Sequence, residues 1–352
     1  MTLKKIPKIF LITLEFPPQI GGVSRYYDGL VKHWSGEIKV MPANLKCPLW
    51  PHWLPLIWRV GKIVKKEKIE MLWVGQVLPV GYVALWFKRR KKVPYTVFTH
   101  GMDILVPQKS RWKKYWLKKI LFNAELVVAN SQFTRGELIK LGVVEWRIIV
   151  VYPCPVEMKD SSLALLPQND IEKIILSVGR LVKRKGFDKV IDVMPRLLKR
   201  VPDLKYVIIG NGPEIAALQN QIAELGLSDN VEILEKVYDK ELQEWYNKCT
   251  LFALPCRQIG VDVEGFGLVF LEAALAGKPV VAGNSGGAPE TIRHGYGGFV
   301  IEPDSPDELY QALLKILTDE PFANRLGDYG CDWVSRNFQW EKEIEKLKEK
   351  IN

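Results

Sequence analysis

Short apolar runs alternate with longer stretches of mixed polarity along the whole chain. Runs rich in valine, isoleucine and leucine are typical of strands buried on both faces of a parallel sheet, and the stretches between them are long enough for helices. The expected strands form two sets of six. The first set comprises Lys8–Leu14, Ile38–Met41, Met71–Val74, Tyr95–Thr99, Leu126–Ala129 and Ile148–Val151. The second set comprises Ile174–Val178, Tyr206–Ile209, Val231–Leu234, Leu251–Leu254, Val280–Ala282 and Phe299–Ile301.

This alternation predicts an α/β protein with two Rossmann-like domains that face each other across a cleft. A length of 352 residues also favours two domains over one. The boundary is expected from Tyr152-Pro-Cys-Pro155 to Asn169, because prolines and polar residues interrupt the apolar pattern there. Since open parallel sheets bind ligands at the carboxyl ends of their strands, chemistry is expected in the loops that follow the strands.

Two carboxylates, Glu264 and Glu272, bracket a glycine-rich turn and the start of a helix. Gly265 and Gly267 lie beside the first glutamate, and Leu271–Ala276, which contains the second, is a strong helix former. Backbone N–H groups at the entry to a helix bind anions, and a carboxylate beyond them can accept hydrogen bonds from sugar hydroxyls. The segment therefore predicts a ligand that carries both phosphate and sugar.

A basic loop follows the first strand of the second set. It contains Arg180 and then Lys183, Arg184 and Lys185 in succession. Arginine offers a planar fork to phosphate oxygens and lysine adds a compact charge, so the loop would neutralise a departing diphosphate. A solvated basic loop is the alternative, and Lys183 and Arg184 fit it. Arg180 and Lys185 are preferred as ligands because glycines flank them.

Three more loops carry residues that suit ligand binding. Gly21 and Gly22 precede a helix, where they either admit a phosphate to the backbone or form an ordinary turn. His100 ends a strand and is either a donor to a sugar hydroxyl or phosphate, or a structural histidine bonded to a carbonyl. Gly286 and Gly287 precede a proline, so this loop either exposes N–H groups or forms a tight turn.

The remaining loops and the histidines bear on which ligands, metals and cofactors the sequence supports. Gly210–Pro213 is a turn by composition, and the backbone near Val237 either lines a base pocket or is a plain connector. None of the four histidines has metal-ligand spacing. The sequence also lacks the Gly-x-Gly-x-x-Gly fingerprint and a Gly-Lys-Ser/Thr phosphate loop. We therefore expect no metal and no bound cofactor.

Charge is unevenly distributed along the chain. Up to Glu157 there are 26 basic and 10 acidic residues, whereas the remainder holds 24 and 30. A cationic half favours an anionic partner, which is a membrane surface or a nucleic acid. No apolar run approaches the roughly 20 residues of a membrane-spanning helix, and Ile9–Thr13 is too short for a secretory signal. Five cysteines without C-x-x-C spacing are typical of a reduced cytosolic protein.

The cationic half contains one segment with a membrane-binding pattern. Lys109–Phe122 interleaves lysines with Trp112, Tyr115 and Trp116 near helical spacing. This is typical of a helix on an anionic bilayer surface, and a core-packed helix with a solvated basic face is the alternative. Further rings and charges in the same half are at Trp50–Trp53, Lys62–Lys68 and Lys88–Lys92.

Taken together, these motifs resemble the retaining glycosyltransferases of family four, which have the GT-B fold. The matching elements in chain order are Gly21-Gly22, His100, Gly179-Arg180 with Lys185-Gly186, Glu264-x7-Glu272 and Gly286-Gly287-x-Pro289-Glu290. Asp262–Glu272 and Ser285–Glu290 are most similar to the branch that holds bacterial phosphatidylinositol mannosyltransferases. One departure is Tyr152-Pro-Cys-Pro155, where the family commonly has Pro-x-Gly-Val-Asp.

The resemblance implies how a nucleotide-sugar donor would be held. Arg180 and Lys185 would bind its diphosphate in place of a metal ion. Glu272 would hold the ribose hydroxyls, and Glu264 with the backbone of Phe266–Leu268 would hold the sugar and phosphates. The implied donor-binding residues are Gly21, Gly22, Gly179, Arg180, Lys185, Val237, Glu264, Phe266, Gly267, Leu268 and Glu272. The implied catalytic residues are His100, Arg180, Lys185 and Glu264.

The resemblance also implies what the first domain does. Gly22 would close on the diphosphate and His100 would contact the transferred sugar. The family is thought to transfer with retention, the leaving phosphate helping to deprotonate the acceptor. Residues 1–157 with 336–352 would form an acceptor- and membrane-facing domain, and residues 158–335 a nucleotide-sugar-binding domain. The amphipathic segment Phe338–Ile351 would return to the first domain, with Trp340 as an anchor; a free surface helix is the alternative.

We therefore expect a metal-independent hexosyltransferase in the cytoplasm, peripheral on the inner face of the cell membrane. Its donor would be GDP-mannose, with UDP-hexoses next, and its acceptor a lipid-linked or other glycan. A sugar-nucleotide epimerase of the same fold would need no acceptor, and a phosphorylase would need a pyridoxal lysine. A nucleic-acid-binding protein is a further alternative, but nucleic-acid binding does not explain the paired glutamates. A transferase with a soluble acceptor also remains open.

Overall fold

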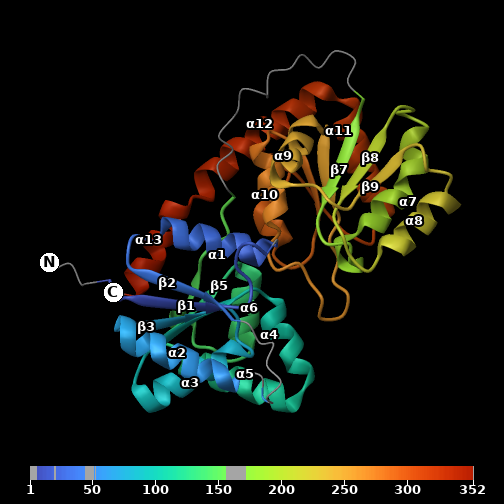
Figure 1. Ribbon diagram of the computed structural model, residues 1–352. Helices are drawn as coiled ribbons and strands as arrows, with labels where there is room; N and C mark the ends of the chain where they lie inside the picture. The colour runs from blue at the N-terminus through green and yellow to red at the C-terminus, as the bar shows by residue number, and fades with distance from the viewer. Residues whose placement is uncertain (1–5, 20, 44–50, 52, 156–171, 352) are drawn as a thin grey trace. The chain divides into compact units, whose positions relative to one another are not determined.

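The computed structural model describes residues 6–19, 21–43, 51, 53–155 and 172–351. Trp50 and His52 of the predicted aromatic cluster, and most of the predicted boundary segment, lie outside these residues. The chain forms two compact units. Unit 1 is Met1–Cys154 with Phe338–Asn352, and unit 2 is Pro155–Asn337. Each unit contains a parallel sheet flanked by helices (Figure 1), which confirms the predicted α/β architecture.

The sheet of unit 1 has six parallel strands in the order β2-β1-β3-β4-β5-β6. Their bounds are β1 Ile9–Thr13, β2 Ile38–Pro42, β3 Met71–Val74, β4 Tyr95–Thr99, β5 Leu126–Ala129 and β6 Ile148–Val150. Every residue of β1 and β4 is buried. Burial on both faces explains why these strands read as nearly unbroken apolar runs in the sequence.

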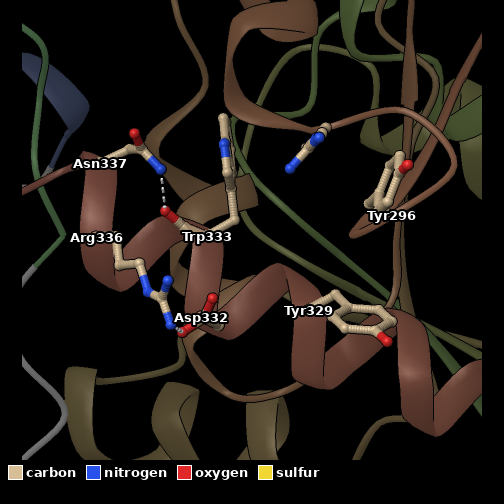
Figure 2. A pocket seen from close by; sticks show the side chains of 7 residues that line it. Tyr296, Tyr329, Asp332, Trp333, Arg336 and Asn337 are labelled. Atoms are coloured by element: carbon tan, nitrogen blue, oxygen red, sulfur yellow. Dashed lines mark hydrogen bonds and ion pairs between the residues drawn. The ribbon is translucent and has the colours of Figure 1, made fainter.

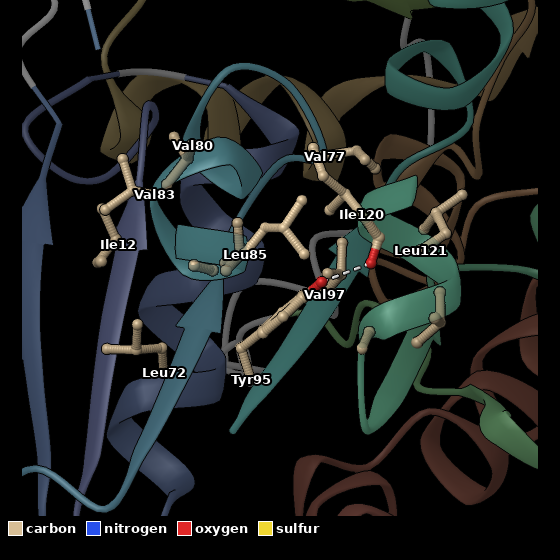
Figure 3. Packing of buried hydrophobic residues seen from close by; sticks show 14 of the residues in the cluster. Ile12, Leu72, Val77, Val80, Val83, Leu85, Tyr95, Val97, Ile120 and Leu121 are labelled. Carbon is tan, nitrogen blue, oxygen red and sulfur yellow. Dashed lines mark hydrogen bonds between the residues drawn. The ribbon is translucent and has the colours of Figure 1, made fainter. Parts of the chain in front are cut away.

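Each helix of unit 1 buries apolar residues in this unit. They are α1 Gly22–His33, α2 Leu54–Glu67, α3 Val80–Lys91, α4 Met102–Leu105, α5 Arg111–Asn123, α6 Gln132–Lys140 and α13 Trp340–Ile351. In α5, Leu117, Ile120 and Leu121 are fully buried, as their helical spacing requires. The hydroxyl of Tyr95 donates to the carbonyl of Ile120 at 2.6 Å within this core (Figure 3).

The last helix, α13, packs on α1 within unit 1, as predicted. Trp340 is 5% exposed, and its ring stacks on His33 at a centroid distance of 5.9 Å. A Cβ at Gly29 would lie 2.4 Å from the indole, so only glycine permits this approach. Further along α13, the buried carboxylate of Glu343 accepts a hydrogen bond from the backbone N–H of Tyr152 at 3.0 Å.

The sheet of unit 2 has the strand order β12-β11-β10-β7-β8-β9. The strands are β7 Ile174–Val178, β8 Lys205–Ile209, β9 Val231–Leu234, β10 Leu251–Leu254, β11 Val280–Gly283 and β12 Gly298–Ile301. The helices are α7 Phe187–Leu198, α8 Ile215–Glu224, α9 Asp239–Lys248, α10 Leu268–Leu275, α11 Pro306–Thr318 and α12 Glu320–Asn337. Within the described ranges, no helix of either unit is both long and apolar enough to cross a bilayer.

Both sheets contain a point at which the strand order reverses. In unit 1 the reversal falls between β1 and β3, and in unit 2 between β7 and β10. Ligands of such sheets bind outside the carboxyl ends of the strands at the reversal, where the loops diverge and leave an opening. The basic loop after β7 and the glutamate segment after β10 therefore share the expected ligand position of unit 2.

Candidate active site

Glu264 is the centre of a buried ion cluster in unit 2. Its Oε2 lies 2.7 Å from Lys185 Nζ and 2.5 Å from Arg184 Nη1. Glu264 and Lys185 are 8% and 7% exposed. Burial alone would raise the pKa of Glu264, but the charges of Lys185 and Arg184 outweigh burial and lower the pKa to about 2. Glu264 is therefore a fixed anion at any physiological pH.

The local fold explains how Lys185 reaches Glu264. A short 3₁₀ turn, Lys183–Lys185, follows β7 and ends at Gly186, whose φ is +77°. A Cβ at Gly186 would lie 2.2 Å from the carbonyl oxygen of Pro255, at the end of β10. Glycine thus lets the turn press against the neighbouring strand end. Gly179 lies beside Lys185: the Nζ atom of the lysine is 3.5 Å from where a Cβ on Gly179 would be.

Arg184 was expected to be solvated, and this prediction is wrong. Its side chain is 18% exposed and bridges two carboxylates, with Nε 2.9 Å from Asp262 Oδ1 in addition to the contact with Glu264. Lys183, by contrast, is exposed as expected. The signal in the sequence was the acidic pair Asp262-Val-Glu264, which complements the adjacent cations Arg184 and Lys185.

Glu272 is held by a residue that the sequence analysis did not single out. It lies in α10, which starts after Gly267 at φ +100°. The buried hydroxyl of Tyr246, from α9, donates to Glu272 Oε2 at 2.9 Å. Phe266 and Leu268 are also buried around this helix start. The glycine and the tyrosine together fix the direction of the helix and of its carboxylate.

The loop containing Gly286 and Gly287 supports the Glu264 segment. The N–H of Gly287 donates to the carbonyl of Glu264 at 2.9 Å. A Cβ at Gly286, whose φ is +60°, would lie 2.0 Å from the same carbonyl oxygen. The sequence left open whether this loop exposes its N–H groups or forms a tight turn. In the structure the N–H of Gly287 is bonded and both glycines pack closely against the Glu264 segment, as in a tight turn.

Arg180 and Val237 do not join the buried cluster. Arg180 is exposed on the loop after β7 and, among the described residues, makes no ion pair within 4 Å. That loop is tied to the one after β8 by the Leu181 N–H, which donates to the carbonyl of Asn211 at 3.0 Å. Val237 is half-buried in the connection between β9 and α9. The structure thus gathers Lys185, Glu264 and the unforeseen Arg184 and leaves Arg180 open to solvent.

In unit 1, His100 is fixed by a tyrosine and a carboxylate. Its Nε2 lies 2.7 Å from the Tyr27 hydroxyl, and its backbone N–H donates to Asp103 Oδ1 at 2.8 Å. The rings of Tyr26 and Tyr27 contact the imidazole edge to face at 5.4 Å. Burial lowers the pKa of His100 to about 4, so the ring is neutral at neutral pH.

The start of α1 leaves room for a ligand at Gly22. Apart from its chain neighbours and the backbone of its own helix, no atom of the described residues lies within 4 Å of where a Cβ on Gly22 would be. Glu15 lies on the other side of this loop, with Oε2 3.7 Å from the position of a Cβ on Gly21. Burial raises the pKa of Glu15. The first turn of α1 has no acidic residue, so its free N–H groups keep their attraction for an anion.

A separate surface hollow of about 210 Å³ lies on α12 (Figure 2). Its polar groups pair with one another: Arg336 lies 2.7 Å from Asp332, and Asn337 donates to the carbonyl of Trp333. None of the predicted site residues lines it. Across the described part of the chain, no group of three His, Cys, Asp or Glu side chains is arranged to hold a metal ion.

Comparison with known proteins identifies the family. The "Glycosyltransferase Family 4" pattern matches residues 23–155, and "Glycosyl transferases group 1" matches residues 160–333. An uncharacterised glycosyltransferase of Methanocaldococcus jannaschii is 33% identical over 95% of both chains. The chain belongs to glycosyltransferase family 4. This glycosyltransferase is also 28% identical, over 98% of both chains, to a GDP-mannose-dependent phosphatidylinositol monomannoside mannosyltransferase of Mycolicibacterium smegmatis.

Solved structures show the fold of this glycosyltransferase. HepE of Anabaena, crystallised with UDP, has a TM-score of 0.78 and 22% identity, with 97% of this chain and 98% of that chain covered. Sucrose-phosphate synthase of Thermosynechococcus elongatus has the same TM-score and coverage at 20% identity. The expected GT-B fold and the expected glycosyltransferase class are both confirmed.

Proposed function

We propose that this glycosyltransferase transfers a mannosyl residue from GDP-mannose to a lipid-linked acceptor at a membrane surface, with retention of configuration. The observation that carries the proposal is the buried Lys185–Glu264 pair, at 2.7 Å, beside the strand reversal of unit 2. This pair supports the proposal because its cation suits a diphosphate, its ionised carboxylate suits sugar hydroxyls, and the two lie on adjoining loops.

Unit 2 would bind the donor through residues of opposite charge. Lys185 and the exposed Arg180 neutralise the diphosphate, which removes the need for a metal ion. Electrostatic stabilisation of the leaving group usually contributes more to such catalysis than any other effect, and removing one donor costs about 3–4 kcal/mol. Glu264 accepts hydrogen bonds from the sugar, and Glu272, held by Tyr246, accepts them from the ribose.

Two of the related proteins support the choice of donor. The M. smegmatis relative is GDP-mannose-dependent, which favours GDP-mannose. The Anabaena structure holds UDP, which keeps a UDP-hexose as the second candidate. In unit 1, the neutral ring of His100 suits a hydrogen bond to the transferred sugar better than it suits proton donation, because its pKa lies well below neutrality.

The exposed face of α5 supports a membrane-bound acceptor. Leu117, Ile120 and Leu121 fill the core, so the helix is core-packed on one side. Away from this core, Trp112 and Tyr115 are 65% and 53% exposed, Lys113 and Lys114 are exposed, and Lys118 and Lys119 are half-buried. Rings and cations on one face are typical of helices that lie at an anionic bilayer surface. Each cation there contributes about 1 kcal/mol.

A transfer assay tests the proposed reaction. The purified protein is mixed with GDP-mannose or UDP-glucose and with vesicles that do or do not contain phosphatidylinositol mannosides. The proposal predicts mannosylated lipid only with GDP-mannose and acceptor vesicles. Release of an epimerised nucleotide sugar in the absence of acceptor would indicate an epimerase instead. Transfer to soluble sugars as efficient as transfer to the lipid would contradict a lipid-linked acceptor.

A flotation assay with anionic vesicles tests the membrane surface. One variant replaces four lysines of α5 by glutamine, and a matched control replaces four exposed basic residues of unit 2. The α5 lysines are Lys113, Lys114, Lys118 and Lys119, and the control residues are Lys199, Arg200, Lys236 and Lys240. We expect the α5 variant to lose vesicle binding and the control to keep it. Unchanged binding of the α5 variant would contradict the assignment of this face.

A further inference from the structure

In this structure Lys185 is engaged by Glu264, although the proposed function needs it for the donor diphosphate. Its Nζ lies 2.7 Å from Glu264 Oε2. If Lys185 were the sole partner of Glu264, turning its ammonium to a diphosphate would leave a carboxylate that is 8% exposed without a paired cation. An unpaired buried charge is strongly unfavourable, so Lys185 would be held back from the ligand.

Arg184 is placed to replace it. Its Nη1 lies 2.5 Å from the same oxygen, Glu264 Oε2, and its Nε lies 2.9 Å from Asp262 Oδ1. The two contacts use different edges of one planar guanidinium, which lysine does not offer. Burial disfavours the charged form of Arg184, but Glu264 and Asp262 outweigh burial and raise its pKa above the ordinary value. Arg184 is therefore a permanent cation.

The backbone of Arg184 is anchored as firmly as its side chain. Its carbonyl accepts the N–H of Arg257 at 2.7 Å. Arg257 is 8% exposed and makes a two-pronged ion pair with Asp188, at 2.9 and 2.7 Å, in the first turn of α7. These contacts tie the 3₁₀ turn to both β10 and α7, so Arg184 stays in place when its neighbour moves.

Resting on the proposed function, we infer that Arg184 is a positioning residue that holds Glu264 while Lys185 is released to the donor diphosphate. Among the described residues, the ion pairs and hydrogen bonds of the Glu264 side chain all fall on Oε2, including the one from Cys256 Sγ at 3.8 Å. Arg184 thus keeps that oxygen anchored and leaves Oε1 for a sugar hydroxyl. Arg184 itself does not touch the donor.

The inference predicts an unusual rescue in nucleotide binding. Arg184→Gln would pin Lys185 on Glu264 and weaken binding of GDP and UDP roughly tenfold, as expected for one lost charged contact. Adding Glu264→Gln would free Lys185 again, so the double variant would bind the nucleotide as the wild type does. A residue that contacts the diphosphate directly, or one that merely maintains the fold, would show no such rescue.

Isothermal titration of the full-length protein with GDP and with UDP makes this test without any sugar or acceptor. Lys183→Gln is the matched control, since Lys183 lies in the same turn but is exposed, and its affinity is expected to equal the wild type. If Arg184→Gln binds the nucleotide as tightly as the wild type, or if the double variant binds it as weakly as Arg184→Gln, the role of Arg184 is overturned but the proposed function is not. Absence of nucleotide binding by the wild type overturns both it and the proposed donor. Failure of mannosyl transfer with the rescue intact overturns only the proposed reaction.

Discussion

The hydroxyl of Tyr27 lies 2.7 Å from His100 Nε2 and 2.5 Å from the carbonyl oxygen of Gly75. A carbonyl only accepts, and the tyrosine has a single proton, so Tyr27 donates to Gly75 and accepts from His100. His100 is then the neutral tautomer with its proton on Nε2 and a lone pair on Nδ1. Any ligand group that meets Nδ1 must itself be a donor, as a sugar hydroxyl is.

We predict that Tyr27→Phe disturbs this tautomer. Loss of one hydrogen bond of about 1 kcal/mol lowers kcat/KM roughly fivefold, because the ring is no longer held in one state. Long-range ¹H–¹⁵N NMR of labelled histidine reads the tautomer directly. Tyr26→Phe is the control, since Tyr26 packs on the same ring but bonds to the carbonyl of Val151. A wild-type proton on Nδ1 would contradict the assignment.

The ion cluster around Glu264 predicts a pH-dependent stability. The pKa of Glu264 is lowered to about 2, so its contribution is complete above the ordinary value of 4.5 and is lost as the pH falls toward 2. Glu264→Gln should lower the free energy of unfolding by about 3–5 kcal/mol at pH 7, because it breaks a buried pair. Denaturant titrations from pH 7 to pH 3 should show this difference shrinking below pH 4.5. A difference that stays constant with pH would contradict the ion cluster.

The hydrogen bond from Tyr246 to Glu272 predicts a loss of nucleotide affinity. Tyr246→Phe keeps the packing of α9 but leaves the carboxylate without this donor, so the Kd for the nucleotide should rise roughly fivefold, equal to about 1 kcal/mol. Tyr95→Phe is the matched control: its hydroxyl bonds to Ile120 in the core of unit 1. That variant should lose a similar amount of stability but no affinity. Equal nucleotide affinities of Tyr246→Phe and Tyr95→Phe would contradict the proposal that Glu272 binds the nucleotide.

The packing of α13 on α1 predicts opposite effects of two glycine substitutions. Gly29→Ala should destabilise the protein by about 1–3 kcal/mol, because its Cβ meets the Trp340 indole. Gly136→Ala in α6 has open space and should stabilise it by about 0.5–1 kcal/mol. Thermal unfolding measures both. A harmless Gly29→Ala would mean that α13 does not rest on α1 in solution.

The strands could be predicted from sequence because burial on both faces leaves an apolar run that needs no tertiary information. Tyr95–Thr99 and Ile174–Val178 have the predicted bounds, for example. The residues that orient the site could not be predicted, because their partners are distant in sequence. Arg184 and Glu264 are 80 positions apart, and Tyr27 and His100 are 73.

Neighbouring residues in one turn also differ in ways that composition does not show. Lys183, Arg184 and Lys185 are consecutive cations, yet the 3₁₀ turn directs them differently: the first is exposed and the other two reach Glu264. Arg180 is the reverse case, since flanking glycines made it a preferred ligand while the structure leaves its side chain in solvent. Its role in donor binding stays a prediction.

Calorimetric titration of GDP-mannose into the wild type and Lys185→Gln tests the central claim most directly, with Lys183→Gln as control. The account predicts binding by the wild type and the control, and a loss of at least about tenfold in Lys185→Gln, because a charged contact to the diphosphate is removed. Equal affinity of Lys185→Gln and the wild type would contradict the claim that the buried lysine beside Glu264 holds the donor diphosphate.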